Sequence, residues 1–135
     1  MEAYKHIVQY YETDKMGITH HSNYIRWMEE ARIEFLKQIG WDYAKLEELG
    51  IISPVVDVTC KYKNPTTFSE EIYITVSVQE FKGIKLILHY EMKRDATIVA
   101  EASSTHCFLD INGKPIRLDK QFKDFDLAIK NCLNN

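Results

Sequence analysis

The sequence predicts one α+β domain in which an antiparallel sheet packs around a long helix. Apolar residues recur at helical spacing between residues 22 and 40, and they alternate with polar residues in four successive segments after residue 54. The gaps between these segments are short, so neighbouring strands should pair antiparallel, because parallel pairing needs a longer crossover. At 135 residues the chain is long enough for one core. We therefore expect a single domain over residues 1–135.

The first predicted element is a strand over residues 4–11. His6, Val8 and Tyr10 recur at a spacing of two and would share one face of this strand. The strand is expected to end at the polar residues that follow it and at Gly17, which favours a turn. A polar loop then leads to the helix.

The strongest predicted element is the helix that ends near Ile39. Ser22 or Asn23 can cap it, because a short side-chain oxygen at that place accepts free backbone N–H groups. Gly40 supplies a left-handed stop. The apolar residues that share one helical face are Tyr24, Trp27, Met28, Ala31, Phe35 and Ile39. This wide aromatic stripe predicts a helix on the face of a sheet, followed by a shorter helix over residues 43–49.

Four strands are predicted after Pro54, each with apolar residues at a spacing of two. The alternating residues are Val56, Val58, Cys60 and Tyr62; Ile72, Ile74, Val76 and Val78; Ile84, Leu86, Leu88, Tyr90 and Met92; and Ile98, Ala100, Ala102 and Ser104. A final helix is predicted from Leu118 to Leu133.

The composition narrows the classes of partner. Lys and Arg total 17 against 20 Asp and Glu, a net charge of −3, so a nucleic acid partner is not expected. The N-terminal segment lacks the apolar core of a signal peptide, and no apolar run reaches the length of a membrane span. Three separated cysteines without a CxxC pair favour reduced thiols over disulfides or structural zinc. These features predict a cytoplasmic protein.

Residues 10–24 gather an acid, a glycine turn, two histidines and a helix N-terminus. Asp14 precedes the helix, and the first backbone N–H groups of the helix, near His21 to Tyr24, carry the positive end of its dipole. A carbonyl oxygen placed there would be polarised, while a neighbouring carboxylate could attack the carbonyl carbon or activate water. This arrangement predicts acyl transfer to water.

The same segment carries a family resemblance. The matching residues are Tyr10, Thr13, Asp14, Met16, Gly17, His21, Ser22, Asn23, Tyr24 and the run 27–36. In these residues, and in the order of its elements to about Pro115, the chain resembles the 4-hydroxybenzoyl-CoA thioesterase-like branch of the hotdog fold, including the YbgC-type acyl-CoA thioesterases. The resemblance implies a hotdog fold, in which an antiparallel sheet wraps a central helix.

The resemblance also implies roles for single residues. Asp14 would be the catalytic carboxylate, His21 would place a backbone N–H toward the thioester carbonyl, and Tyr10 would lie near the site. The residues expected to bind substrate are Gly17, Tyr24, Tyr62 and Lys63. No metal is expected, because adjacent His20 and His21 point in different directions and no third ligand follows at a suitable spacing.

The implied substrate is a short- to medium-chain or aromatic acyl-CoA, or the corresponding acyl carrier thioester. Coenzyme A is then part of the substrate, and no other cofactor is expected. The resemblance, together with the exposed edges of a small sheet, predicts a homo-oligomer that is a dimer of dimers, a homotetramer, with the site at the subunit junction. Whether Asp14 acts as nucleophile or as general base stays open.

Several residues have a structural alternative. Asp14 alone could be a turn residue. Glu29 and Glu30 lie at the helical position where a second hotdog thioesterase type carries its acid, but we expect a solvated face with Arg26–Glu30 and Glu29–Arg32 salt bridges.

Other charged and histidine residues lie in the strands. His89 and His106 are expected to be hydrogen-bonded core or surface residues. Lysines near strand ends could meet the phosphates of coenzyme A, although solvated charges are the default. These lysines are Lys61, Lys63, Lys82 and Lys85.

The alternative function is a non-hydrolytic acyl-thioester binding protein or a dehydratase-like hotdog protein. Dehydratases of this fold pair a histidine with an acid on the central helix. Asp14 lies before the helix, so the sequence favours a hydrolase.

Overall fold

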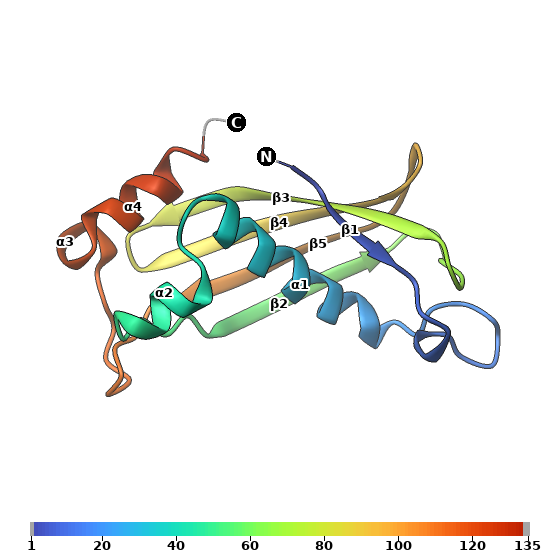
Figure 1. Ribbon diagram of the computed structural model, residues 1–135, viewed down its shortest axis with the longest axis horizontal. Helices are drawn as coiled ribbons and strands as arrows, with labels where there is room; N and C mark the ends of the chain where they lie inside the picture. Colours follow the sequence, from blue (N-terminus) through green and yellow to red (C-terminus); the bar gives the residue numbers. More distant parts are fainter. Residues whose placement is uncertain (1, 134–135) are drawn as a thin grey trace.

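A five-stranded antiparallel sheet with a long helix across one face dominates the computed structural model, which describes residues 2–133 (Figure 1). The strands are β1 (Tyr4–Ile7), β2 (Val55–Tyr62), β3 (Glu71–Lys82), β4 (Lys85–Arg94) and β5 (Thr97–Cys107). The helices are α1 (Ser22–Gln38), α2 (Tyr43–Glu48), α3 (Leu118–Gln121) and α4 (Lys123–Lys130), and a single 3₁₀ turn is η1 (Tyr10–Glu12). The predicted α+β class is confirmed. Within the described residues, no helix is both long and apolar enough to cross a bilayer.

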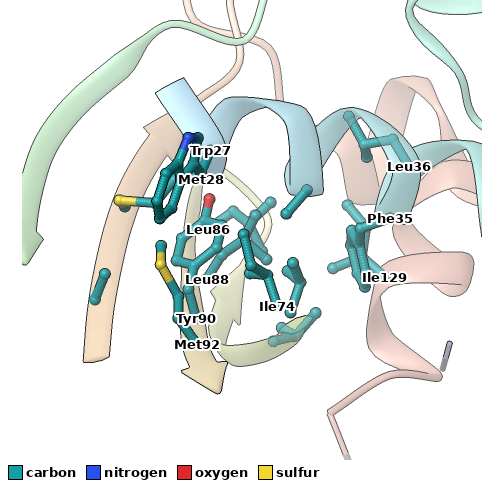
Figure 2. Close-up of a cluster of buried hydrophobic side chains, with 14 of the residues drawn as sticks. Trp27, Met28, Phe35, Leu36, Ile74, Leu86, Leu88, Tyr90, Met92 and Ile129 are labelled. Atoms are coloured by element: carbon teal, nitrogen blue, oxygen red, sulfur yellow. The ribbon is translucent and has the colours of Figure 1, made fainter. Parts of the chain in front are cut away.

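The core forms between α1 and the sheet, as the apolar stripe predicted. Figure 2 shows side chains of α1 against those of β3, β4 and α4. Trp27 and Met28 are fully buried, as are Leu88, Tyr90 and Met92 of β4. Each buried large apolar side chain contributes about 1.5–3 kcal/mol relative to exposure. This packing fixes the helix, and hence its N-terminus, relative to the sheet.

The start of α1 differs from the predicted cap. His21 rather than Ser22 or Asn23 is the N-cap, with φ −56° and ψ −29°. The His20 ring accepts the Ser22 N–H at 3.2 Å, so a neighbouring side chain replaces the predicted hydroxyl or amide cap. The stop is as predicted, because Gly40 follows the helix at φ +86°, a backbone conformation that L side chains rarely adopt.

The first strand is shorter than predicted. β1 ends at Ile7, and η1 begins at Tyr10. The Gln9 N–H donates to the Glu12 carboxylate at 2.8 Å, and the Glu12 N–H donates to the Gln9 carbonyl at 3.0 Å. These two bonds close a tight turn where simple alternation predicted extended chain.

The C-terminal helix is interrupted. The predicted helix from Leu118 to Leu133 is two helices, because Phe122 has φ −138° and ψ 67°, outside the helical region. Phe122 packs against the core at this break, and Phe125 and Ile129 of α4 are fully buried. The break between α3 and α4 therefore lies at the residue, Phe122, whose side chain packs against the core.

The sheet order is β1-β3-β4-β5-β2, so β1 and β2 are its edges. β2 pairs with β5 only, and its last residue, Tyr62, lies opposite Ala100. The Tyr62 hydroxyl donates to the His21 carbonyl at 3.2 Å. The end of β2 thus lies beside the start of α1, at the right of Figure 1.

Candidate active site

A cleft of about 430 Å³ opens beside the N-terminus of α1. This volume is within the range of about 300–1,000 Å³ that small-molecule sites occupy. Its lining includes predicted site residues from three places in the sequence, namely Asp14, His21, Tyr24, Tyr62 and Lys63. The fold therefore brings together the acid, the helix start and the end of β2.

Asp14 lies in a tight loop before α1. Its N–H donates to the Ile18 carbonyl at 2.8 Å, and its carbonyl accepts the Gly17 N–H at 3.0 Å. The Met16 N–H donates to the Asp14 Oδ1 at 2.8 Å. Gly17 has φ +81°, which explains the glycine in this turn. Within residues 2–133 the Asp14 Oδ2 accepts no hydrogen bond, so this oxygen is free to meet a substrate or a water molecule.

The helix start offers one free donor. The N–H groups of Asn23 and Tyr24 donate to the carbonyls of His20 and His21, at 3.0 and 3.2 Å. The Ser22 N–H is taken by the His20 ring. Over the described part of the chain, the His21 N–H has no such acceptor. This donor at the positive end of a helix can polarise a carbonyl oxygen.

Aromatic rings form a wall of the cleft. The Tyr24 and Tyr62 rings meet edge to face with centroids 4.9 Å apart, and His21 meets Tyr62 in the same way at 6.1 Å. Burial raises the pKa of Tyr62 to about 12 and also raises the pKa of Tyr24. Both phenols therefore stay neutral at physiological pH and serve as apolar surface and hydrogen-bonding groups.

Lys63 is the only one of the four strand-end lysines in the cleft lining. Its ammonium forms an ion pair with Glu101 at 3.2 Å. Lys82 and Lys85 belong to the β3–β4 hairpin. In the sheet register Lys85 lies opposite Cys107, the last residue of β5, whereas Ala100, opposite Tyr62 at the cleft, is near the other end of β5. Within one chain, these two lysines lie at the opposite end of the sheet from the cleft and do not line it.

Two of the predicted site residues do not line this cleft. Gly17 shapes the turn beside it. Tyr10 is 76% exposed, and its ring packs edge-on against Phe68 with centroids 5.7 Å apart. Its carbonyl accepts both the N–H and the hydroxyl of Thr13, so its backbone supports the loop. A direct role of the Tyr10 side chain stays a prediction.

The helix salt bridges predicted from spacing are wrong. Glu30 accepts hydrogen bonds from the Tyr4 hydroxyl at 2.7 Å and from the His6 Nδ1 at 3.0 Å. Arg32 is buried and donates to the Tyr90 hydroxyl at 3.2 Å. The sequence spacing could have indicated the burial of Arg32, because Arg32 follows the buried Tyr24 and Met28 at a spacing of four residues and so lies on the same helical face.

Sequence reasoning also missed Glu12. We expected it in a polar segment at the end of the strand, but it is 4% exposed and bonded to side chains of β1 and α1. His106 is a buried, hydrogen-bonded residue, as predicted, with its Nε2 2.7 Å from the Ser104 hydroxyl.

Comparisons with known proteins agree with this geometry. The sequence model of the thioesterase-like superfamily matches residues 8–126. The Bacillus subtilis protein YneP, provisionally named an acyl-CoA thioesterase, is 36% identical to this chain over 123 residues, which cover 90% of this chain and 89% of YneP.

Solved structures give the same result. The DHNA-CoA thioesterase from Staphylococcus aureus has a TM-score of 0.91 and 31% identity, over 96% of this chain and 89% of that protein. The gentisyl-coenzyme A thioesterase BH1999 has a TM-score of 0.84 and 27% identity, over 96% of this chain and 100% of that protein. The predicted hotdog fold is confirmed.

Proposed function

Because this chain belongs to the thioesterase-like superfamily, we propose that it hydrolyses acyl-CoA thioesters with Asp14 as the catalytic carboxylate. One observation carries this proposal. The cleft collects a carboxylate with a free oxygen and the residue whose backbone N–H is free at the start of α1. Thioester hydrolysis needs these two parts, a group that delivers oxygen and a donor for the carbonyl oxygen.

Asp14 has two routes to product. As a general base it takes a proton from water, whose oxygen bonds to the acyl carbon while the bond from carbon to sulfur breaks. As a nucleophile it forms a mixed anhydride with release of the thiolate, and water then cleaves the anhydride. In both routes the His21 N–H donates to the carbonyl oxygen as its negative charge develops. A thiolate leaves readily, so no Ser-His-Asp triad is needed.

A dehydratase-like reaction finds less support in the same molecule. The histidine and helix acid that approach each other are His6 and Glu30, at 3.0 Å. His6 is 9% exposed and its other ring nitrogen is bound to Glu12. Neither His6 nor Glu30 lines the cleft. The acid that lines the cleft is Asp14, which precedes the helix, and this position favours hydrolysis over dehydration.

The residues that line the cleft indicate which kind of acyl group it can bind. Edge-to-face rings of Tyr24 and Tyr62, with Met16, Ile18 and Pro65 nearby, form a largely apolar lining. This surface suits an aromatic acyl group or a short to medium aliphatic chain. Lys63 at the cleft offers a cation to a phosphate of coenzyme A.

We also propose that the working enzyme is a homo-oligomer. β2 is an edge strand of eight residues, with Val55 43% and Val56 61% exposed. Pairing of two β2 strands from two copies would satisfy the β2 edge of each copy and cover these side chains. Since Tyr62 and Lys63 lie at the end of β2, such pairing would bring a second chain to the cleft.

Release of free thiol from a panel of thioesters tests the proposed function. The panel contains an aromatic acyl-CoA, short and medium aliphatic acyl-CoAs, and the matching acyl-pantetheines. We expect turnover of at least one acyl-CoA. We also expect a lower kcat/KM for its pantetheine analogue, because that analogue lacks the nucleotide phosphates that would contact Lys63. No turnover of any thioester by the folded protein would contradict the proposal.

A further inference from the structure

We propose that Glu12 is a positioning residue, which clamps the Asp14 loop onto α1 so that the Asp14 carboxylate and the His21 N–H act on the same carbonyl group. This inference rests on the proposed hydrolysis at the cleft. Glu12 does not line the cleft itself. It would act through the two residues that do.

The Glu12 carboxylate is fully engaged. Its Oε1 accepts the Gln9 N–H and a hydrogen bond from the His6 Nε2, each at 2.8 Å. Its Oε2 accepts the indole N–H of Trp27, also at 2.8 Å. These donors come from the residue that precedes η1, from β1 and from α1. The side chain therefore fixes one point of the chain, two residues before Asp14, to two elements of the core.

The Glu12 main chain makes a second set of bonds. Its carbonyl accepts the His20 N–H at 2.8 Å and the Asn23 side-chain amide at 3.0 Å. The first bond closes the base of the loop from residue 13 to residue 19. The second ties that base to the first turn of α1. One residue thus holds both ends of the loop, immediately next to the free N–H of His21.

His6 extends the clamp. Its Nε2 lies 2.8 Å from the Glu12 carboxylate and its Nδ1 lies 3.0 Å from the Glu30 carboxylate, so one ring bridges the two acids. Glu30 also accepts the Tyr4 hydroxyl at 2.7 Å. Burial would raise the pKa of Glu12, but the Gln9, His6 and Trp27 donors outweigh it and hold that pKa below its usual value. The Glu12 carboxylate is therefore ionised and acts as an acceptor only.

A carboxylate at residue 12 can fix the position of the loop through directional hydrogen bonds, which an apolar side chain cannot form. Burying a carboxylate is costly unless it is fully hydrogen-bonded, and apolar packing holds part of the loop only weakly, since Met16 is 76% exposed. Directional bonds to Glu12 therefore set the position of the loop. A displacement of about 1 Å between reacting groups can cost about 100-fold in rate.

The first test is Glu12→Gln, which keeps the shape but turns one acceptor into a donor that faces an N–H. We expect kcat to fall by about 10- to 100-fold with KM changed less than about threefold. The matched control is Glu48→Gln, the same change on an exposed residue of α2, which should leave both constants unchanged. Wild-type kcat in Glu12→Gln would overturn the proposal.

A double-mutant cycle separates positioning from a general loss of structure. If Glu12 acts through Asp14, Glu12→Gln should add little to the loss already caused by Asp14→Asn. An equal loss in both backgrounds would overturn the proposal. Where Glu12→Gln does not fold, Trp27→Phe replaces it in the same cycle, because phenylalanine keeps an aromatic ring but lacks the indole N–H that donates to Glu12.

Amide hydrogen exchange makes the proposal independent of turnover. Glu12→Gln should speed exchange at the His20 and Asp14 N–H groups and leave the core strands protected. Unchanged exchange at these two groups would contradict the clamp even if hydrolysis is confirmed. Faster exchange in a protein that hydrolyses no thioester would instead place the failure in the proposed function.

Discussion

At the scale of single residues, the site depends on backbone geometry that surrounds one carboxylate. The Met16 N–H holds one oxygen of Asp14, and no hydrogen bond from the described residues reaches the other oxygen. At the helix start, the His20 ring and carbonyl take the N–H groups of Ser22 and Asn23. The donor that remains belongs to His21, and our account assigns the catalytic contribution of this residue to its backbone.

A pair of substitutions at residue 21 tests that assignment. His21→Ala keeps the N–H, so kcat should fall less than about tenfold, whereas His21→Pro removes it and kcat should fall by about 10²- to 10³-fold. Proline fits the φ of −56° found at this residue. Steady-state kinetics with circular dichroism as the folding control would decide. An equal loss in the two variants, both of which lack the imidazole, would assign the role to the side chain instead.

The sequence was informative for residues whose role follows from local position. Asp14 before a glycine turn and His21 before a helix were both predicted, and both line the cleft. Glu12 was missed because its burial depends on His6 and Trp27, which reach it from two other elements, β1 and α1. Glu30 was placed on a solvated face for the same reason, since its partners are in β1. Hydrogen bonds between a carboxylate and a residue of another element do not produce a periodic pattern in the sequence.

At the scale of elements, hydrophobic periodicity predicted what packs directly on the core. The α1 stripe and the alternation in β3 and β4 correspond to buried faces, because those faces meet each other. Prediction failed where hydrogen bonds or single backbone angles decide. η1 replaces the end of the first strand through the Gln9 and Glu12 bonds, and the unusual dihedral angles of Phe122 split the last helix.

The edge strand β2 allows a prediction about assembly. We expect light scattering to give at least twice the 15.9 kDa chain mass at micromolar concentration. Val56→Lys places a charge on the exposed edge, so it should lower the mass toward one chain without unfolding the protein. A wild-type mass of one chain would contradict assembly through β2. An unchanged mass in Val56→Lys would place the interface elsewhere.

At the scale of the whole molecule, a buried histidine couples stability to pH. Burial lowers the pKa of His106 from 6.5 to about 4, and the positive charge of Arg32 acts in the same direction. The unfolded chain therefore binds a proton between these values that the folded chain does not. The stabilisation is complete above pH 6.5 and is lost as the pH falls toward 4.

This difference predicts a loss of about 3 kcal/mol in the free energy of unfolding between the two pH values. Urea denaturation at several pH values measures it. His106→Gln should flatten the slope in that window, since glutamine does not titrate. The same slope in both proteins would show that other groups cause it. The effect of Glu12, whose lowered pKa lies below 4.5, belongs to more acidic conditions.

The central claim is that Asp14 supplies the chemistry of thioester hydrolysis, and kcat of Asp14→Asn on a good acyl-CoA substrate tests it most directly. Asparagine keeps an oxygen for the Met16 N–H and removes only the charge, so the loop should hold its shape. We predict that kcat falls by about 100-fold or more while the thermal midpoint stays unchanged. Turnover near the wild-type rate in a folded Asp14→Asn protein would contradict the account and place the catalytic acid elsewhere.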